Sequence, residues 1–160
     1  MAAEFWFGFM FVRDPFERAV SAYYNKVKKE NYFNGRNWTI VEYFEHLIKN
    51  DVTDRHFKPQ YQLCNPCSLN VSYLGRTETM ISDMDAIINR QTSLHMKIPF
   101  DPKDQVSTNV SLKNTTGKAM NDIYLQLDPK LMKKFIWKYR LDYLAFGYNP
   151  YSLLSKLSPK

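Results

Sequence analysis

Glycine is scarce in this chain, which has only five glycines among 160 residues. They are spread from position 8 to position 147, so no glycine-rich phosphate loop of the GxxxxGK[ST] kind is present. No serine lies in a GxSxG turn, the motif that exposes the nucleophile of α/β-hydrolases. The sequence therefore lacks the signatures of two large enzyme classes.

Histidine and long apolar runs are also scarce. Of the three histidines, His46 falls in a predicted helix and His95 in a predicted loop. His56, in the stretch DRHFKPQ, is the only one in a candidate functional segment. The longest apolar run is far shorter than the roughly 20 residues that span a bilayer. The first residues carry no secretory signal.

The only two cysteines form the motif Cys64-Asn-Pro-Cys67, which has three interpretations. Zinc requires about four ligands, and His56 with the two cysteines supplies at most three. A thioredoxin-like redox motif opens a helix, whereas Pro66 indicates a loop. The third interpretation is a disulfide of the secretory pathway, either between these cysteines or to one outside this chain. It agrees with four Asn-x-Ser/Thr glycosylation sequons. These are Asn37, Asn70, Asn109 and Asn114.

Basic and aromatic residues are plentiful. The chain has 22 Lys and Arg against 16 Asp and Glu, a net charge of +6. Its 44% hydrophobic and 16% aromatic content argues against disorder and favours one domain with a buried core. The charge suits an acidic partner: a polyanionic sugar, a nucleotide or a nucleic acid. No RNP-like, KH or zinc-finger signature supports RNA binding.

The stretch 5–26 predicts a strand followed by a helix. Phe5–Val12 is apolar almost throughout, which is typical of a strand buried on both faces of a parallel sheet. Asp14 is a good N-cap, Pro15 suits the first helical position, and Glu17 occupies the capping-box position. The helix is expected to reach about Asn31. Its apolar positions recur at steps of three and four. They are Phe16, Ala19, Val20, Tyr23, Tyr24 and Val27.

This turn is a candidate anion site. Arg13 follows the strand, at the sheet edge where α/β folds bind ligands, and the adjoining helix N-terminus favours anions. A guanidinium donates a planar fork of N–H groups suited to phosphate or sulfate. Ser21, two turns into the helix, offers a hydroxyl to the same anion. Alternatively, Arg13 pairs with Asp14 or Glu17 and Ser21 is a small packing residue.

The rest of the chain alternates between helices and strands, which predicts an α/β fold. Thr39 and Glu42 form a capping box at the start of one helix, and Asp128 caps another. The expected elements are a helix over 39–50, an irregular stretch 51–70, a strand over 71–75, a helix over 78–90, a surface loop over 93–116, helices over 118–127 and 129–139, and a closing segment 141–148.

Four motifs, in order along the chain, resemble the Golgi carbohydrate sulfotransferases, the group that includes chondroitin and dermatan 4-O-sulfotransferases. The motifs are FVRDPFERAVSAY, HFKPQYQLCNPC, LGRTETMISDMDAII and LAFGY. The resemblance implies a P-loop-like α/β fold with a short parallel sheet flanked by helices. It also implies sulfuryl transfer from 3′-phosphoadenosine 5′-phosphosulfate to a sugar hydroxyl of a glycosaminoglycan or glycoprotein glycan, without a metal and without nucleic acid. The implied location is the Golgi lumen, as part of a single-pass type II membrane protein.

Carried over residue by residue, the resemblance implies that Arg13 and Ser21 bind the 3′-phosphate of the donor. A basic rim for an acidic glycan, similar to chondroitin or dermatan, is then expected at Lys26, Lys28, Lys29 and Arg36. The catalytic base is not identified, and His56 is the only internal candidate.

The sequence departs from the family pattern at two places. Val71-Ser72 stands where relatives have Tyr-Asp. The family's loop with a lysine for the 5′-phosphosulfate has no match. We therefore expect residues 1–160 to be one catalytic domain truncated on its N-terminal side, with that loop and the membrane anchor absent. Two alternatives remain: a relative that binds nucleotide or glycan without turnover, and a basic RNA-binding domain.

Overall fold

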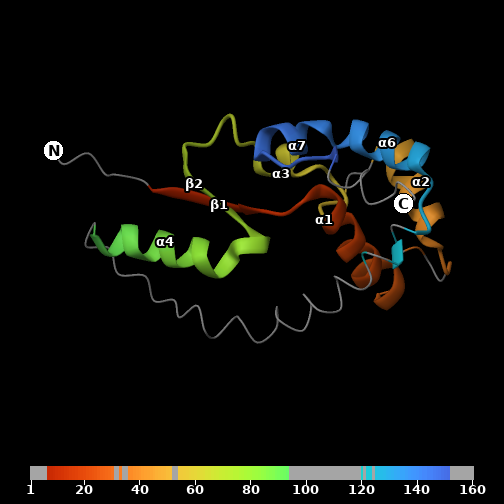
Figure 1. Cartoon of the computed structure of the whole chain (residues 1–160), viewed down its shortest axis with the longest axis horizontal. Coiled ribbons are helices and arrows are strands. Elements are labelled where there is room, and N and C mark those ends of the chain that lie inside the picture. The colour runs from red at the N-terminus through yellow and green to blue at the C-terminus, as the bar shows by residue number, and fades with distance from the viewer. Residues whose placement is uncertain are drawn as a thin grey trace.

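A two-stranded parallel sheet and a cluster of helices make up the molecule. The structure is a computed structural model that describes residues 7–30, 33, 36–51, 54–93, 120, 122–123 and 125–151. The elements are β1 (Gly8–Val12), α1 (Pro15–Ala22), the π-helical segment η1 (Tyr23–Lys29), α2 (Ile40–Lys49), α3 (Gln60–Cys64), β2 (Val71–Arg76), the 3₁₀ turn η2 (Thr77–Thr79), α4 (Met80–Ser93), α6 (Pro129–Lys138) and α7 (Arg140–Phe146). In Figure 1, α4 lies along the sheet, whereas α1, α2, α6 and α7 gather beyond the carboxyl end of β1.

The two strands pair in parallel register from Gly8 opposite Val71 to Val12 opposite Arg76, with one irregularity after Gly8. A Cβ at Gly8 would lie 2.6 Å from the carbonyl oxygen of Asn70, so only glycine fits this close approach. The parallel pairing and the short sheet flanked by helices agree with the α/β class. The expected burial of β1 on both faces is wrong. Only Val12 is buried, and Phe9 is 45% exposed, so the described elements leave part of the faces of this strand uncovered.

Local sequence signals place the helix starts correctly. The Asp14 carboxylate accepts hydrogen bonds from the backbone N–H groups of Phe16 (2.9 Å) and Glu17 (3.0 Å), with Pro15 at the first turn. Thr39 and Glu42 form the predicted capping box of α2. Asp128 precedes α6 as expected, but its side chain makes no capping hydrogen bond.

The helix after Asp14 continues to Lys29, although from Tyr23 onward it is π-helical. This change of period rotates the later side chains. Tyr24, expected in the apolar stripe, is 44% exposed, whereas Tyr23 and Val27 are buried.

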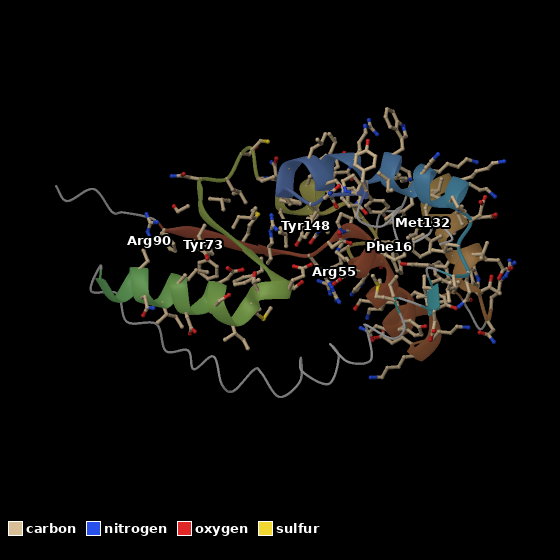
Figure 2. The ribbon with its side chains drawn as sticks, viewed as in Figure 1. Phe16, Arg55, Tyr73, Arg90, Met132 and Tyr148 are labelled. Atoms are coloured by element: carbon tan, nitrogen blue, oxygen red, sulfur yellow. The ribbon has the colours of Figure 1, made fainter. Side chains whose placement is uncertain are left out.

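The core lies where α1, α2 and α6 meet. Phe16, Phe44 and Phe135 are fully buried, with ring centroids 5.0 to 5.9 Å apart. Phe16 and Met132 mark this cluster in Figure 2. Burying such large apolar side chains supplies most of the stabilising free energy of a domain this size.

The remaining segments agree with the expectations only in part. The stretch 51–70 is not irregular throughout, because Gln60–Cys64 forms the short helix α3. The closing segment is the helix α7, which ends at Gly147 with a left-handed φ of 66°. The expected loop at 93–116 lies outside the described residues except for Ser93, which belongs to α4. Of the helix expected at 118–127, residues 120, 122 and 123 are helical, whereas 125–127 form a turn and a bend. No described helix has the length and apolar character needed to cross a bilayer.

Candidate functional site

An open pocket of about 470 Å³ lies beside the turn from β1 to α1. It brings together Arg13, Ser21 and His56, the three residues singled out in the sequence. The complete lining is Arg13, Arg18, Ser21, Ala22, Asn25, Lys26, Arg55, His56 and Leu63. Four of these described residues are Arg or Lys, and none carries a carboxylate. The arrangement therefore favours an anionic ligand.

Hydrogen bonds from the side chain of Gln60 to the backbone of Arg13 hold this residue at the pocket. Its N–H donates to Gln60 Oε1 (3.1 Å), and its carbonyl accepts from Gln60 Nε2 (2.7 Å). The Arg13 Nε is buried and has no hydrogen-bond partner among the described residues. Its nearest carboxylate oxygen, on Glu17, is 3.6 Å away. The ion pair considered in the sequence therefore exists, but it is too long to satisfy this donor.

Arg18, which the sequence did not single out, also lines the pocket. Its guanidinium donates to the carbonyl oxygens of Lys58 (2.7 Å) and Arg55 (2.6 Å). Burial lowers the pKa of Arg18, because desolvation disfavours its charged form. Arg18 thus fixes the loop that carries Arg55 and His56, and Arg55 lies beside α1 in Figure 2.

His56 lies in this loop with a carboxylate beside it. Its Nδ1 is 2.8 Å from Asp54 Oδ1, which also accepts from the His56 backbone N–H at 2.8 Å. An Nδ1–H donated to Asp54 leaves Nε2 as a proton acceptor. The pair therefore has the geometry of an oriented general base.

The segment that follows His56 is anchored by the C-terminal helices. The hydroxyl of Tyr139 donates to the carbonyl of Phe57 (2.6 Å). The two oxygens of Asp142 accept from the backbone N–H groups of Gln60 (2.8 Å) and Tyr61 (2.9 Å). Asp142 is fully buried, and this burial raises its pKa. The buried carboxylate of Asp142 therefore fixes the position of α3 and, with it, of Gln60.

The third and fourth sequence motifs meet at the same strand end. Glu78 accepts from the backbone N–H of Asp14 (2.9 Å) and from the Tyr148 hydroxyl (3.0 Å). The Arg76 guanidinium lies 4.9 Å from the centre of the Tyr148 ring. Tyr148 is labelled beside this junction in Figure 2. All four motifs therefore contribute to the surroundings of the β1–α1 turn.

The expected basic rim is only partly at the pocket. Lys26 lines it and pairs with Glu30 at 2.6 Å. Lys28 instead donates to Asn37 (2.5 Å), and Arg36 pairs with Glu42 (3.1 Å). Neither of these side chains, nor Lys29, is among the pocket residues.

Both cysteines are thiols in the structure, and the expected disulfide is not shown. Cys64 is half-buried and Cys67 exposed. Burial raises the pKa of the Cys64 thiol. Among the described residues, no group of three or more His, Cys, Asp or Glu side chains is placed to bind a metal ion.

The arginine at the end of β1 lines a basic pocket beside α1, an arrangement that favours an anionic ligand. The chain belongs to the Sulfotransferase family, whose sequence model matches residues 2–149. It is 27% identical to carbohydrate sulfotransferase 14 of Danio rerio over 168 residues, covering 89% of this chain and 44% of the relative. It is 25% identical to carbohydrate sulfotransferase 12 of Xenopus laevis over 182 residues (92% and 41%).

A third relative is carbohydrate sulfotransferase 11 of Rattus norvegicus, 25% identical over 171 residues that cover 88% of this chain and 46% of the relative. The chain spans less than half the length of these three proteins. No solved structure matches it significantly.

Proposed function

We propose that this protein transfers a sulfuryl group from 3′-phosphoadenosine 5′-phosphosulfate to a sugar hydroxyl of a glycosaminoglycan or glycoprotein glycan. The observation that carries the proposal is the pocket in which Arg13 and Ser21 lie beside three further basic side chains. Its volume is within the range of about 300–1,000 Å³ that is usual for small-molecule sites. The polyanionic donor matches the positive lining in charge.

In this proposal Arg13 binds the 3′-phosphate of the donor. Its buried Nε has no hydrogen-bond partner in the part of the chain that the structure describes, so a phosphate oxygen would satisfy a donor that Glu17 at 3.6 Å does not. The Gln60 hydrogen bonds hold the Arg13 backbone before the ligand arrives, which lowers the entropy lost on binding. Ser21 adds a hydroxyl from the adjoining helix.

His56 acts as the acceptor base. As the sulfur–oxygen bond to the leaving phosphate breaks and a bond to the sugar oxygen forms, the hydroxyl proton must be removed. With Nδ1–H donated to Asp54, the Nε2 of His56 takes that proton, and the Asp54 carboxylate stabilises the imidazolium that results.

The proposal extends to the fold type, the acceptor and the cellular location. The fold is P-loop-like, the acceptor is an acidic polysaccharide similar to chondroitin or dermatan, and the protein works in the Golgi lumen. There Cys64 and Cys67 are oxidised, and a membrane anchor and the lysine loop for the 5′-phosphosulfate are supplied by sequence outside these 160 residues.

Titration calorimetry with adenosine 3′,5′-bisphosphate, AMP and a single-stranded RNA tests the nucleotide site. We expect the bisphosphate to bind at least tenfold more tightly than AMP, because only the bisphosphate presents a 3′-phosphate to Arg13; a charged hydrogen bond contributes roughly 1.5–3 kcal/mol. Equal affinities for the bisphosphate and AMP would contradict the assignment of Arg13. Preference for RNA would favour the RNA-binding alternative. Bisphosphate binding without sulfate transfer by the whole protein would identify a non-catalytic relative.

A further inference from the structure

A second pocket, of about 620 Å³, lies on the outer side of α6, where that helix packs against α2. In Figure 1, α6 and α2 lie side by side, away from the sheet. The pocket is lined by Ile48, Lys133, Lys134, Trp137, Lys138 and Arg140, and it shares no residue with the Arg13 pocket. Four of these six described side chains are basic and none is acidic.

Trp137 is the unusual member of this pocket. Its side chain is 69% exposed, although tryptophan is the largest side chain available to the core. The Arg140 guanidinium lies 4.5 Å from the ring centre, and Arg140 Nη1 donates to the Trp137 carbonyl at 2.9 Å. The aromatic face and a cation are thus held together at the surface.

The lysines of the pocket fall into two groups. The Lys138 ammonium binds the carbonyl oxygens of Asn50 and Ile48, where it closes the carboxyl end of α2. Lys133 and Lys134 are exposed, and neither takes part in an ion pair among the described residues. Lys138 therefore has a structural role, whereas Lys133, Lys134 and Arg140 present uncompensated positive charge.

We propose that this surface, which we call the Trp137 pocket, binds an acidic polysaccharide. A pyranose ring would pack its C–H face on the indole, while Lys133, Lys134 and Arg140 bind the carboxylate or sulfate groups of the same chain. The inference rests on the proposed function, since it takes the ligand to be the glycan acceptor. It adds a second contact for a long acceptor, remote from the nucleotide.

Calorimetric titration of the whole chain with a chondroitin 4-sulfate decasaccharide tests this surface. Trp137→Ala should weaken binding roughly fivefold to tenfold through loss of the stacking surface. The double substitution Lys133→Ala/Lys134→Ala should weaken it about threefold to tenfold and flatten its dependence on salt. The matched control is Lys130→Ala, which removes an exposed charge from the same helix but outside the pocket, and it should change affinity less than about twofold.

Three outcomes would overturn the proposal. One is unchanged affinity of Trp137→Ala, and another is a loss for Lys130→Ala as large as for Lys134→Ala alone. The third is displacement of the decasaccharide by polyuridylate when the concentration of phosphate groups is lower than the concentration of anionic groups on the decasaccharide. Adenosine 3′,5′-bisphosphate titrated into the same variants should bind as in the wild type. If the wild type binds the decasaccharide but not the bisphosphate, the nucleotide site fails and the Trp137 pocket stands.

Discussion

Gln60 holds the backbone of Arg13 through both of its amide atoms, across 47 positions of sequence. The Arg13 N–H donates to Oε1 at 3.1 Å, and Nε2 donates to the Arg13 carbonyl at 2.7 Å. Gln60 is only 6% exposed, and its own backbone N–H is bound by the buried carboxylate of Asp142. The position of the arginine therefore depends on two side chains contributed by distant segments.

We expect Gln60→Ala to destabilise the protein by about 1–3 kcal/mol, because it leaves the N–H and carbonyl of Arg13 without their partner. It should also weaken binding of adenosine 3′,5′-bisphosphate. Urea unfolding and calorimetry measure the two effects. Gln62→Ala is the matched control: Gln62 is exposed, and its side-chain amide donates to the hydroxyl of the neighbouring Tyr61, so its effect should stay within about 0.5 kcal/mol. Equal stability of the two variants would contradict the role of Gln60.

Arg13→Ala should weaken bisphosphate binding by roughly ten- to a hundredfold, since a charge-assisted hydrogen bond to phosphate contributes about 1.5–3 kcal/mol. Ser21→Ala should cost less, on the order of 1 kcal/mol. The control is Arg36→Ala, which removes a paired, exposed guanidinium outside the pocket. Calorimetry at one salt concentration gives all four affinities. An Arg13→Ala variant that binds like the wild type would remove the anion site.

Contacts between residues close in the sequence can be predicted from it, whereas contacts between distant residues cannot. Asp14 and the Thr39–Glu42 box act within three residues, so their caps are legible in the sequence and are confirmed. The parallel pairing of the two strands is confirmed as well, but the burial on both faces that the apolar run Phe5–Val12 predicted is not. The brace of Arg18 to the loop at Arg55 spans 37 residues, and no local pattern distinguishes it from a surface arginine.

The same limit explains the pocket. Arg13, Ser21 and His56 could each be proposed from local motifs, but their common lining is visible only in the fold. Tyr24 was misplaced because the helix changes to π geometry at Tyr23, which breaks the period of 3.6 residues on which the prediction relied. The basic residues around Trp137 lie within one short segment, 130–140, and its density of Lys and Arg was the signal available in the sequence.

Asp14 makes stability depend on pH in a defined direction. Burial raises its pKa from 3.8 to about 6, against the opposing effect of its capping hydrogen bonds. Between these two pH values the folded state therefore holds a proton that the unfolded state has released. The resulting contribution to the free energy of unfolding is complete below about pH 3.8 and is lost as the pH rises through about 6.

Asp14→Asn keeps an N-cap side chain but removes this titration. Between about pH 4 and pH 7, the wild type should lose on the order of 1–3 kcal/mol relative to the variant. Urea unfolding at several pH values measures the difference, in which the remaining titrating groups largely cancel. A constant difference across the range would show that the Asp14 carboxyl titrates normally.

Cys64 and Cys67 are predicted to be oxidised when the protein is made in the secretory pathway, although both are thiols in the structure. Cys64 is the last residue of α3 and Cys67 lies in the turn that follows, so pairing them would constrain this turn. Intact mass with and without reductant, followed by peptide mapping, distinguishes the states. Two freely alkylated thiols, or a stoichiometric zinc ion, would count against oxidation.

The last prediction is that the 160-residue chain binds adenosine 3′,5′-bisphosphate but does not transfer sulfate, whereas a longer form that includes the family's lysine loop does. Arg13 and Ser21 serve the 3′ end of the donor, and the reacting sulfur is at the 5′ end. Loss of one donor that stabilises charge on a leaving oxygen typically costs about a hundred- to a thousandfold in rate, and no segment of this sequence matches that loop.

The assay is transfer of radiolabelled sulfate to desulfated chondroitin by both forms, with His56→Gln prepared in the longer one. Because Asp54 orients the imidazole at 2.8 Å and Gln cannot accept the proton, this variant should lose about a hundred- to ten-thousandfold in rate while still binding the bisphosphate. Asp54→Asn should lose rate as well, since the tautomer is no longer fixed by a carboxylate. Transfer by the short chain at the rate of the long one would show that its own residues supply the leaving-group stabilisation. Full activity of His56→Gln would place the base elsewhere.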